Sequence, residues 1–226
     1  MRYYPVFLDI VDKPVVVIGG GNIALQKVEG LIDAGASVTV ISPELNDRMA
    51  QLRDEGRFVY VKRKYEPGDI EGAELVFVAT DDGAENRRVW QEGRSRHIWV
   101  NAVDDIPNCD FIMPGIVRKG DLILAISTSG TSPAMARKVR EDIEEFLSEE
   151  DAALLDLAAE IRRELREQGI AIKNCQHCLR TSNDVWNVAL DADVKRLLKE
   201  NRRDEAKERV LNLLLSPSGQ HKATHA

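Results

Sequence analysis

A glycine-rich segment near the N-terminus has the residue types and spacing for binding chemistry. The run Gly19-Gly20-Gly21-Asn22-Ile23-Ala24 matches the pattern G-x-G-x-x-A. In that pattern Gly19 allows a tight turn, Gly21 lets a pyrophosphate approach the backbone, and Ala24 lets a helix pack closely on a strand. The N–H groups that open the helix face the anion. The segment therefore predicts a dinucleotide site, although a glycine turn with only a packing role would have the same residues.

A carboxylate that holds ribose hydroxyls usually follows such a loop by about 20 residues, at the end of the second strand. In this chain the strand ends Ile41-Ser42-Pro43-Glu44, so Glu44 stands slightly late for that role. Glu44 equally fits the first turn of the next helix, where an acid favours the helix dipole. No arginine stands beside it, which favours NAD over NADP.

A second carboxylate, Asp104, is the candidate for proton transfer. Asn101 ends the expected strand that contains the apolar run Ile98–Val100, and ligands of open α/β sheets bind beyond the carboxyl ends of the strands. Asp104 would then face the crevice and act as a general base. The alternative is that Asp104 and Asp105 only shape a turn before Pro107.

Histidine and tyrosine are weaker candidates for that role. All four tyrosines lie at or before Tyr65, so the sheet is followed by no Tyr-x-x-x-Lys pair. Of the four histidines, His97 is the one within the sheet region, and we expect it to lie at the surface.

Continuous apolar runs separated by helix-length segments predict the elements that position these residues. Such runs indicate strands buried on both faces of a parallel sheet. The expected strands are Val15–Ile18, Val38–Ile41, Val59–Val61, Leu75–Ala79 and Ile98–Val100, and the expected helices are 22–34, 44–55 and 83–95. Their order predicts an α/β fold with a Rossmann-like, doubly wound parallel sheet over residues 1–105.

The chain changes character after this sheet. Residues 106–147 contain two expected strands, 110–117 and 121–127, joined by a turn at Arg118-Lys119-Gly120. Ser132 then caps a helix that starts at Pro133. Residues 148–215 predict a helical C-terminal domain, and residues 216–226 a disordered tail.

Composition and charge narrow the class of protein. Lys and Arg number 31 against 38 Asp and Glu, so the formal net charge is −7. Nucleic acid is not expected as a partner, because phosphate neutralisation needs a surplus of basic residues. The longest apolar run, Val15–Ile18, is far shorter than the ~20 residues of a membrane helix. We therefore expect a cytoplasmic protein without a membrane part.

The cysteines predict neither a disulfide framework nor a metal site. Their number is three, which is odd, and a lone Cys175-x-x-Cys178 supplies too few ligands for a structural zinc. We expect no bound metal.

Several motifs across residues 3–147 together point to one family. They are Pro5–Leu8, Val16–Ala24 with Lys27, Ala79–Asp82 with Asn86, Asn101–Asp104, Cys109–Pro114, and Ser127–Pro133 with Ala136-Arg137. This combination resembles the precorrin-2 dehydrogenase family, which is the dehydrogenase–ferrochelatase module of siroheme synthase. The resemblance implies NAD-dependent oxidation of precorrin-2 to sirohydrochlorin by a homodimer. Residues 106–147 would form its dimerisation and tetrapyrrole-site region.

The resemblance also implies roles for particular residues. By position, the family's NAD contacts fall on Asn22, Ile23, Pro43 and Glu44, and its key acidic residue falls on Asp104. Some members also insert Fe²⁺ into sirohydrochlorin, and Asp104 would serve both steps. A domain that senses NAD without chemistry is the remaining alternative.

Substrate contacts are expected in the second region. Thr128 occupies a position in the loop facing the tetrapyrrole where some members have serine. The substrate carries eight carboxylates, which an acidic protein receives through a local basic patch. Arg118, Lys119 and Arg137 are the candidates for that patch, whereas Lys138 and Arg140 more readily form a solvated helix face.

Overall fold

The computed structural model describes residues 3–103, 105–170 and 182–215, without the side chains of 182–185. The chain divides into two compact units, Met1–Met113 and Pro114–Ala226. The four-part division expected from the sequence stays a prediction. The pair Cys175 and Cys178 and the tail 216–226 lie outside the described residues.

Five parallel strands form the sheet of the first unit, in the order β3-β2-β1-β4-β5. The strands are β1 (Pro14–Ile18), β2 (Ser37–Ile41), β3 (Val59–Val61), β4 (Leu75–Val78) and β5 (Trp99–Ala102). This order reverses direction at β1 and β4, which is the arrangement of a doubly wound sheet. The predicted Rossmann-like fold is confirmed.

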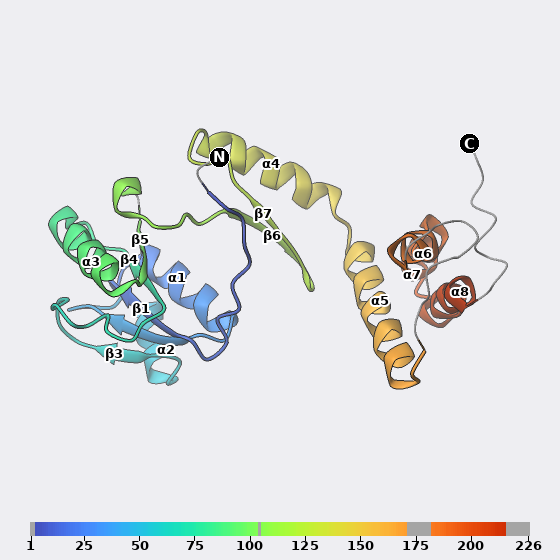
Figure 1. Ribbon diagram of the computed structural model, residues 1–226, viewed down its shortest axis with the longest axis horizontal. Coiled ribbons are helices and arrows are strands. Elements are labelled where there is room, and N and C mark those ends of the chain that lie inside the picture. The colour runs from blue at the N-terminus through green and yellow to red at the C-terminus, as the bar shows by residue number, and fades with distance from the viewer. Residues whose placement is uncertain (1–2, 104, 171–181, 216–226) are drawn as a thin grey trace. The chain divides into compact units, whose positions relative to one another are not determined.

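Three helices cover the two faces of this sheet (Figure 1). They are α1 (Asn22–Asp33), α2 (Asp47–Asp54) and α3 (Gly83–Arg96). Helices α1 and α2 pack on one face, where Val28 and Met49 are fully buried. Helix α3 packs on the other face through Val89, beside the loop that carries Tyr65 and Ile70.

Strand β1 shows why every position in these runs is apolar. Val15 and Val17 belong to the core beneath α1 and α2, whereas Val16 and Ile18 belong to the core beneath α3. Successive side chains of a strand point to opposite faces, so a sheet covered on both sides needs apolar residues throughout.

The helix predicted over 44–55 begins later than expected. Helix α2 starts at Asp47, because the side chain of Asn46 accepts a hydrogen bond from Met49 N (2.9 Å) and caps the helix. Glu44 therefore precedes the helix, and its predicted place in the first turn is wrong.

The second unit begins with an antiparallel hairpin, β6 (Gly115–Lys119) and β7 (Leu122–Ile126). The strand predicted over 110–117 is wrong at its start, because Asp110 N bonds back to Val100 O (2.8 Å) in the first unit. The predicted turn is also displaced, since Lys119 pairs with Leu122 and the turn falls on Gly120 and Asp121.

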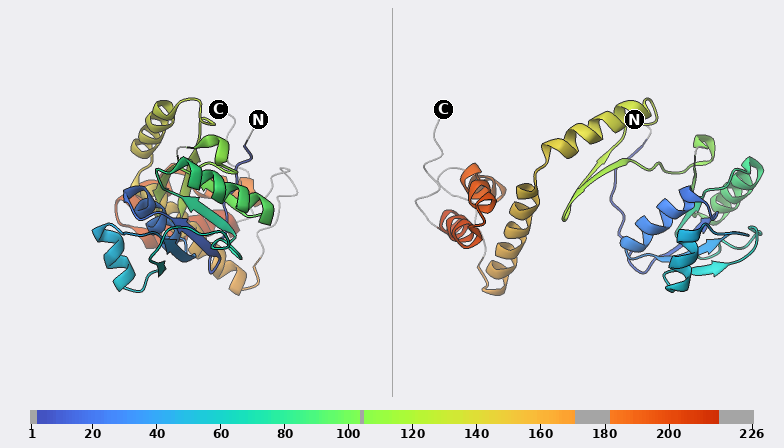
Figure 2. Two further views of the ribbon diagram at one scale, coloured as in Figure 1. Left: turned by 90° about the vertical axis from the view of Figure 1, so that its left-hand side faces the viewer. Right: turned by 180° about the vertical axis from the view of Figure 1, so that it is seen from behind.

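Helix α4 (Pro133–Phe146) packs along this hairpin (Figure 2). The predicted cap is confirmed, because Ser132 Oγ accepts a hydrogen bond from Met135 N (3.2 Å). No side chain of α4 is buried.

Four more helices have a core of their own. They are α5 (Glu149–Glu167), α6 (Ser182–Ala189), α7 (Ala192–Lys199) and α8 (Arg203–Leu215). Ile161, Trp186, Val194 and Val210 are among its buried members. Within the part of the chain that the structure describes, no helix combines the length and apolarity that crossing a bilayer requires.

Candidate functional site

The glycine loop lies at the carboxyl end of β1, between that strand and α1. Gly19 has φ +125°, and its N–H donates to Ile41 O (2.9 Å). A Cβ on Gly19 would stand 2.4 Å from Ala79 O, and one on Gly20 would stand 1.9 Å from Glu44 O. By contrast, a Cβ on Gly21 would meet nothing within 4 Å.

The three glycines are therefore needed for two different reasons. Gly19 and Gly20 are required by the protein's own backbone, whereas Gly21 leaves open space beside the chain. Sequence reasoning assigned no role to Gly20, because its neighbour Glu44 lies 24 residues away in the chain. Only the fold brings that carbonyl oxygen against it.

The N-terminus of α1 differs from those of the two neighbouring helices. Its N-cap is Gly21, which has no side chain to accept from the first N–H groups, and its first turn has no acidic residue. Helices α2 and α3 are capped by the side chains of Asn46 and Asp82. The backbone N–H groups that open α1 are thus left for an anion. Ala24, fully buried, provides the close helix–strand packing that the pattern predicted.

The segment after β2 is fixed against the end of the sheet. Ser42 is buried, and its Oγ donates to Glu44 O (2.7 Å). Tyr60 Oη donates to Ser42 O (2.9 Å). Burial raises the pKa of Tyr60, Arg53 lowers it, and the nearby carboxylate of Glu44 raises it. Pro43 and Glu44 themselves are exposed at this edge.

Two hydrogen bonds bring the loops after β1 and β2 together. Asn46 N donates to Gly20 O (2.8 Å), and Asn46 Nδ2 donates to Asn22 Oδ1 (2.9 Å). The predicted cofactor residues of both loops, including the exposed Ile23, therefore lie at one edge of the sheet.

The loop after β4 completes this edge. Thr80 Oγ1 donates to Asn86 Oδ1 (3.0 Å), which joins the strand end to α3. Asp82 accepts from the N–H groups of Ala84 and Glu85, and these bonds hold the pKa of its carboxyl below the usual range.

The strand that was predicted to end at Asn101 continues one residue farther, to Ala102. Asn101 lies within β5, is buried, and donates through Nδ2 to Phe111 O (2.8 Å). Its side chain therefore fastens the returning chain instead of facing a crevice. Farther along the same segment, Asp105 Oδ2 accepts from Asn108 Nδ2 (2.7 Å). Asp104 lies outside the described residues.

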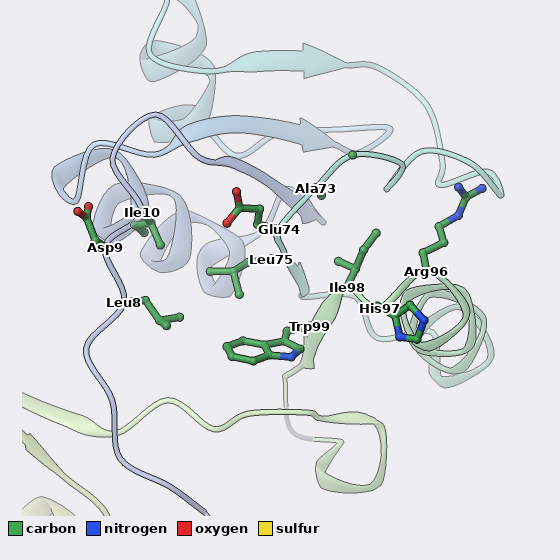
Figure 3. Close-up of a pocket in the computed structure, with 11 residues that line it drawn as sticks. Leu8, Asp9, Ile10, Ala73, Glu74, Leu75, Arg96, His97, Ile98 and Trp99 are labelled. Carbon is green, nitrogen blue, oxygen red and sulfur yellow. The ribbon is translucent and has the colours of Figure 1, made fainter.

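A hollow of about 500 Å³ lies at the opposite, amino end of the sheet (Figure 3). Leu8, Leu75 and Trp99 form its apolar wall, and Arg96 and His97 border it. His97 ends α3 with φ 60° and is exposed, as expected for a surface residue. The hollow is separate from the edge that the loops after β1, β2 and β4 form, because it borders the starts of β4 and β5.

The predicted substrate residues lie in the second unit. Thr128 Oγ1 donates to Ser132 O (3.0 Å) and accepts from Ser132 N (3.2 Å), so the hydroxyl closes its own loop. Arg118 and Arg137 are exposed, and neither forms an ion pair with a described residue.

The neighbouring cations are already paired. Lys119 bonds to Glu149 (2.6 Å), which raises the pKa of the lysine. Arg140 bonds to Glu144 (2.5 Å), and Lys138 lies 3.6 Å from Asp142. Arg118 and Arg137 are therefore the better placed of these cations to meet a carboxylate ligand.

No cluster of three or more metal-binding side chains occurs among residues 3–103, 105–170 and 186–215. Cys175 and Cys178 lie outside these ranges.

Two family models match the chain. Residues 6–115 match the family described as "Putative NAD(P)-binding", and residues 119–145 match "Sirohaem biosynthesis protein central". The first match spans the sheet and every predicted cofactor residue. The second spans most of the hairpin and α4.

Curated relatives include siroheme synthases from several bacteria. The chain is 42% identical to the one from Methylobacillus flagellatus over 168 residues, which are 74% of this chain and 36% of the relative. It is 33% identical to the one from Sodalis glossinidius over 221 residues, which are 98% of this chain and 45% of the relative. The chain thus spans less than half the length of each of these relatives.

A solved structure titled "SirC, precorrin-2 dehydrogenase" has a similar fold. The TM-score is 0.77 at 23% sequence identity, and the match covers 92% of this chain and 98% of that one. The agreement extends over both units.

Proposed function

We propose that this chain, which belongs to the siroheme synthase family, dehydrogenates precorrin-2 to sirohydrochlorin with NAD⁺. One observation carries the proposal: the open space beside Gly21, next to the uncapped N-terminus of α1. It lies at the carboxyl edge of a Rossmann sheet, where dinucleotides bind.

The residues at this edge suit a dinucleotide. Gly21 and the first N–H groups of α1, with Asn22 and Ile23, would hold the pyrophosphate, which only accepts hydrogen bonds. Pro43 and Glu44 would border the adenine ribose. The Glu44 carboxylate disfavours a 2′-phosphate by charge repulsion, so the preferred cofactor is NAD⁺.

The reaction needs one acceptor for a hydride and one for a proton. Bound NAD⁺ would supply the hydride acceptor. Asp104 is proposed as the general base, so that precorrin-2 loses two electrons and two protons overall and yields sirohydrochlorin, NADH and H⁺. The neighbouring residues support this proposal. The chain before Asp104 is anchored by the Asn101 side chain, and the chain after it is anchored by the Asp105–Asn108 hydrogen bond.

The carboxylates of the substrate are proposed to bind in the second unit. Arg118 and Arg137 are exposed and have no ion pair among the described residues. The Thr128 loop is held in shape by its own hydrogen bonds, which leaves the hydroxyl little freedom.

A homodimer is proposed because the hairpin and α4 bury too little on their own. Within residues 115–146, all of which are described, Val117 alone is buried. Ile116 projects from the face opposite Val117 and is 46% exposed, and Met135 on α4 is 51% exposed. A two-stranded hairpin is marginal in water without further packing.

The proposal is tested by anaerobic incubation of the chain with precorrin-2 and NAD⁺, without metal, while NADH and sirohydrochlorin are followed by absorbance. Asp104→Ala should lower the rate by about 100-fold or more, the usual contribution of a general base. Asp54→Ala, a matched change of an exposed carboxylate at the far end of α2, should keep the rate.

The outcomes separate the functions considered. Binding of NAD⁺ without turnover would reject the dehydrogenase and leave a domain that senses NAD. Full activity of Asp104→Ala would remove this residue from catalysis. Addition of Fe²⁺ to the product then tests chelation, which is read as metal-dependent loss of free sirohydrochlorin.

A further inference from the structure

One residue outside the predicted site, Asn46, joins the loops after β1 and β2, at the sheet edge where we propose that the dinucleotide binds. Its Oδ1 accepts from Met49 N (2.9 Å), its Nδ2 donates to Asn22 Oδ1 (2.9 Å), and its backbone N donates to Gly20 O (2.8 Å). It thus contacts the first turn of α2, the start of α1 and the glycine loop.

The first of these bonds determines which way the Asn46 amide is turned. Met49 N is a backbone donor and cannot exchange its role, so it requires an oxygen from the Asn46 side chain. The amide nitrogen of Asn46 must then lie on the other side. There it meets Asn22, which has to present its own oxygen.

The hydrogen bond from Asn46 in turn determines the orientation of the Asn22 side-chain amide. Because the Asn22 oxygen is occupied by Asn46, its Nδ2 group remains as a donor. Within the described residues that group donates to no acceptor. A phosphate oxygen accepts hydrogen bonds and donates none at neutral pH, so only the donor end of an amide binds it favourably.

We infer that Asn46 is a positioning residue for the cofactor: it relays the polarity of the α2 backbone to the Asn22 amide, which then offers its N–H donors to a dinucleotide phosphate. This inference rests on the proposed function, because it takes Asn22 as a contact of NAD⁺. It adds a residue that lies outside the glycine pattern and touches no cofactor itself.

The first test replaces Asn46 by serine. Serine is a good N-cap, so α2 keeps its cap, but the side chain is too short to reach Asn22. Asn46→Ser should weaken NAD⁺ binding by about tenfold in calorimetric titration, the value of an oriented hydrogen bond to a charged group. The melting temperature should stay close to that of the wild type.

Asn46→Asp gives the opposite polarity at the same position. The carboxylate still caps α2, but it only accepts, so Asn22 must turn its Nδ2 toward it and its oxygen toward the phosphate. The loss of affinity should therefore exceed that of Asn46→Ser. A loss smaller than that of the serine variant would overturn the relay.

A double-mutant cycle separates positioning from a general effect on the fold. In an Asn22→Ala background, Asn46→Ser should change the affinity for NAD⁺ by less than about twofold, because the amide that it orients is absent. An undiminished tenfold loss in that background would overturn the inference.

Asp191→Ser serves as the matched control. Asp191 caps α7 through Val194 N (3.0 Å) and pairs with Arg209 (2.5 Å), so this variant exchanges an N-cap for serine in the helical region, removes an ion pair as well, and should bind NAD⁺ normally. If the wild type itself binds no NAD⁺, the proposed function fails. If the wild type binds and Asn46→Ser binds equally well, the positioning role alone fails.

Discussion

The sheet of the first unit and the hairpin region of the second unit differ in how much apolar surface they cover. The two neighbouring central strands, β1 and β4, both have buried side chains on both faces, under helices and loops of the same chain. In the β6–β7 hairpin and α4, Val117 alone is buried, and Phe146 at the end of α4 is 82% exposed.

This contrast indicates what each region depends on. Hydrophobic burial contributes roughly 25 cal/mol per Å² of apolar surface, so the sheet has its main source of stability within one chain. The hairpin region lacks that source and is expected to gain it from a second copy. The stability of the first unit should thus be independent of protein concentration, unlike that of the hairpin region.

The largest effect is expected from Gly20→Ala, which should lower the stability of the sheet unit. The new Cβ would stand 1.9 Å from Glu44 O, a backbone atom that cannot move without opening the edge. The free energy of unfolding should fall by about 3 kcal/mol, at the upper end for overpacking. Denaturant unfolding at two protein concentrations measures it, and a wild-type midpoint would contradict this packing.

A charged side chain on the exposed face of the hairpin should instead weaken the association of two copies of the chain. Ile116→Asp should weaken the proposed homodimer by about 30-fold, which corresponds to about 2 kcal/mol, because a charge would be buried at the proposed interface. Sedimentation over a concentration series measures this change. Val59→Asp is the control, since Val59 is 63% exposed on β3 of the sheet unit and should leave assembly intact. Equal dissociation by both variants would contradict the comparison.

Gly21→Ala, in the same loop, should weaken cofactor binding without destabilising the fold. The backbone of Gly21 has φ −86°, which alanine adopts, and its Cβ would meet no atom of the chain within 4 Å. The melting temperature should therefore stay the same or rise slightly. The added methyl occupies the space proposed for the pyrophosphate, so NAD⁺ affinity should fall by about tenfold in titration. Unchanged affinity would place the phosphates elsewhere.

The smallest effect is expected from an ion pair on the surface of the helical region, outside its hydrophobic core. Bonds from Lys207 (2.6 Å) and Arg203 (2.6 Å) hold the pKa of Glu160 below its usual range. Because the folded pKa is the lower one, the stabilisation is present above the unfolded value of about 4.3 and is lost as pH falls through the folded value.

Glu160→Gln tests this dependence. The difference in stability between wild type and variant should be at most about 1 kcal/mol at pH 7 and should shrink toward pH 3 in thermal melts followed by circular dichroism. Glu167→Gln is the control, because Glu167 is exposed and has no ion pair among the described residues. A difference that grows as pH falls would contradict the assignment.

Much of the fold was predictable from local pattern. The apolar runs predicted all five strands of the sheet within about two residues, because a strand covered on both faces, such as β1, needs apolar residues throughout. The start of α2 was not predictable in the same way. It depends on Asn46, which a propensity pattern does not distinguish from the polar residues around it.

The hairpin was predicted, but the start of its first strand was placed too early for a related reason. The β-rich run from Asp110 reads as a strand, but Asp110 accepts from Val100 N (3.0 Å) and belongs to the edge of the first sheet. That contact joins residues that the pattern had placed in different elements. The hydrogen bond of Asn101 was not predictable either, since its partner Phe111 lies ten residues farther on.

The sequence by itself determined the class of fold, the glycine loop and the resemblance to the precorrin-2 dehydrogenase family, because these depend on short-range spacing of residue types. The tertiary structure decided which glycine serves packing and which leaves space for a ligand, since Gly20 meets Glu44 O only when two loops converge. It also decided the orientation of Asn22, which depends on a helix that begins 25 residues later. Hydrogen-bond direction and steric contact are properties of groups brought together in space, and no local pattern contains them.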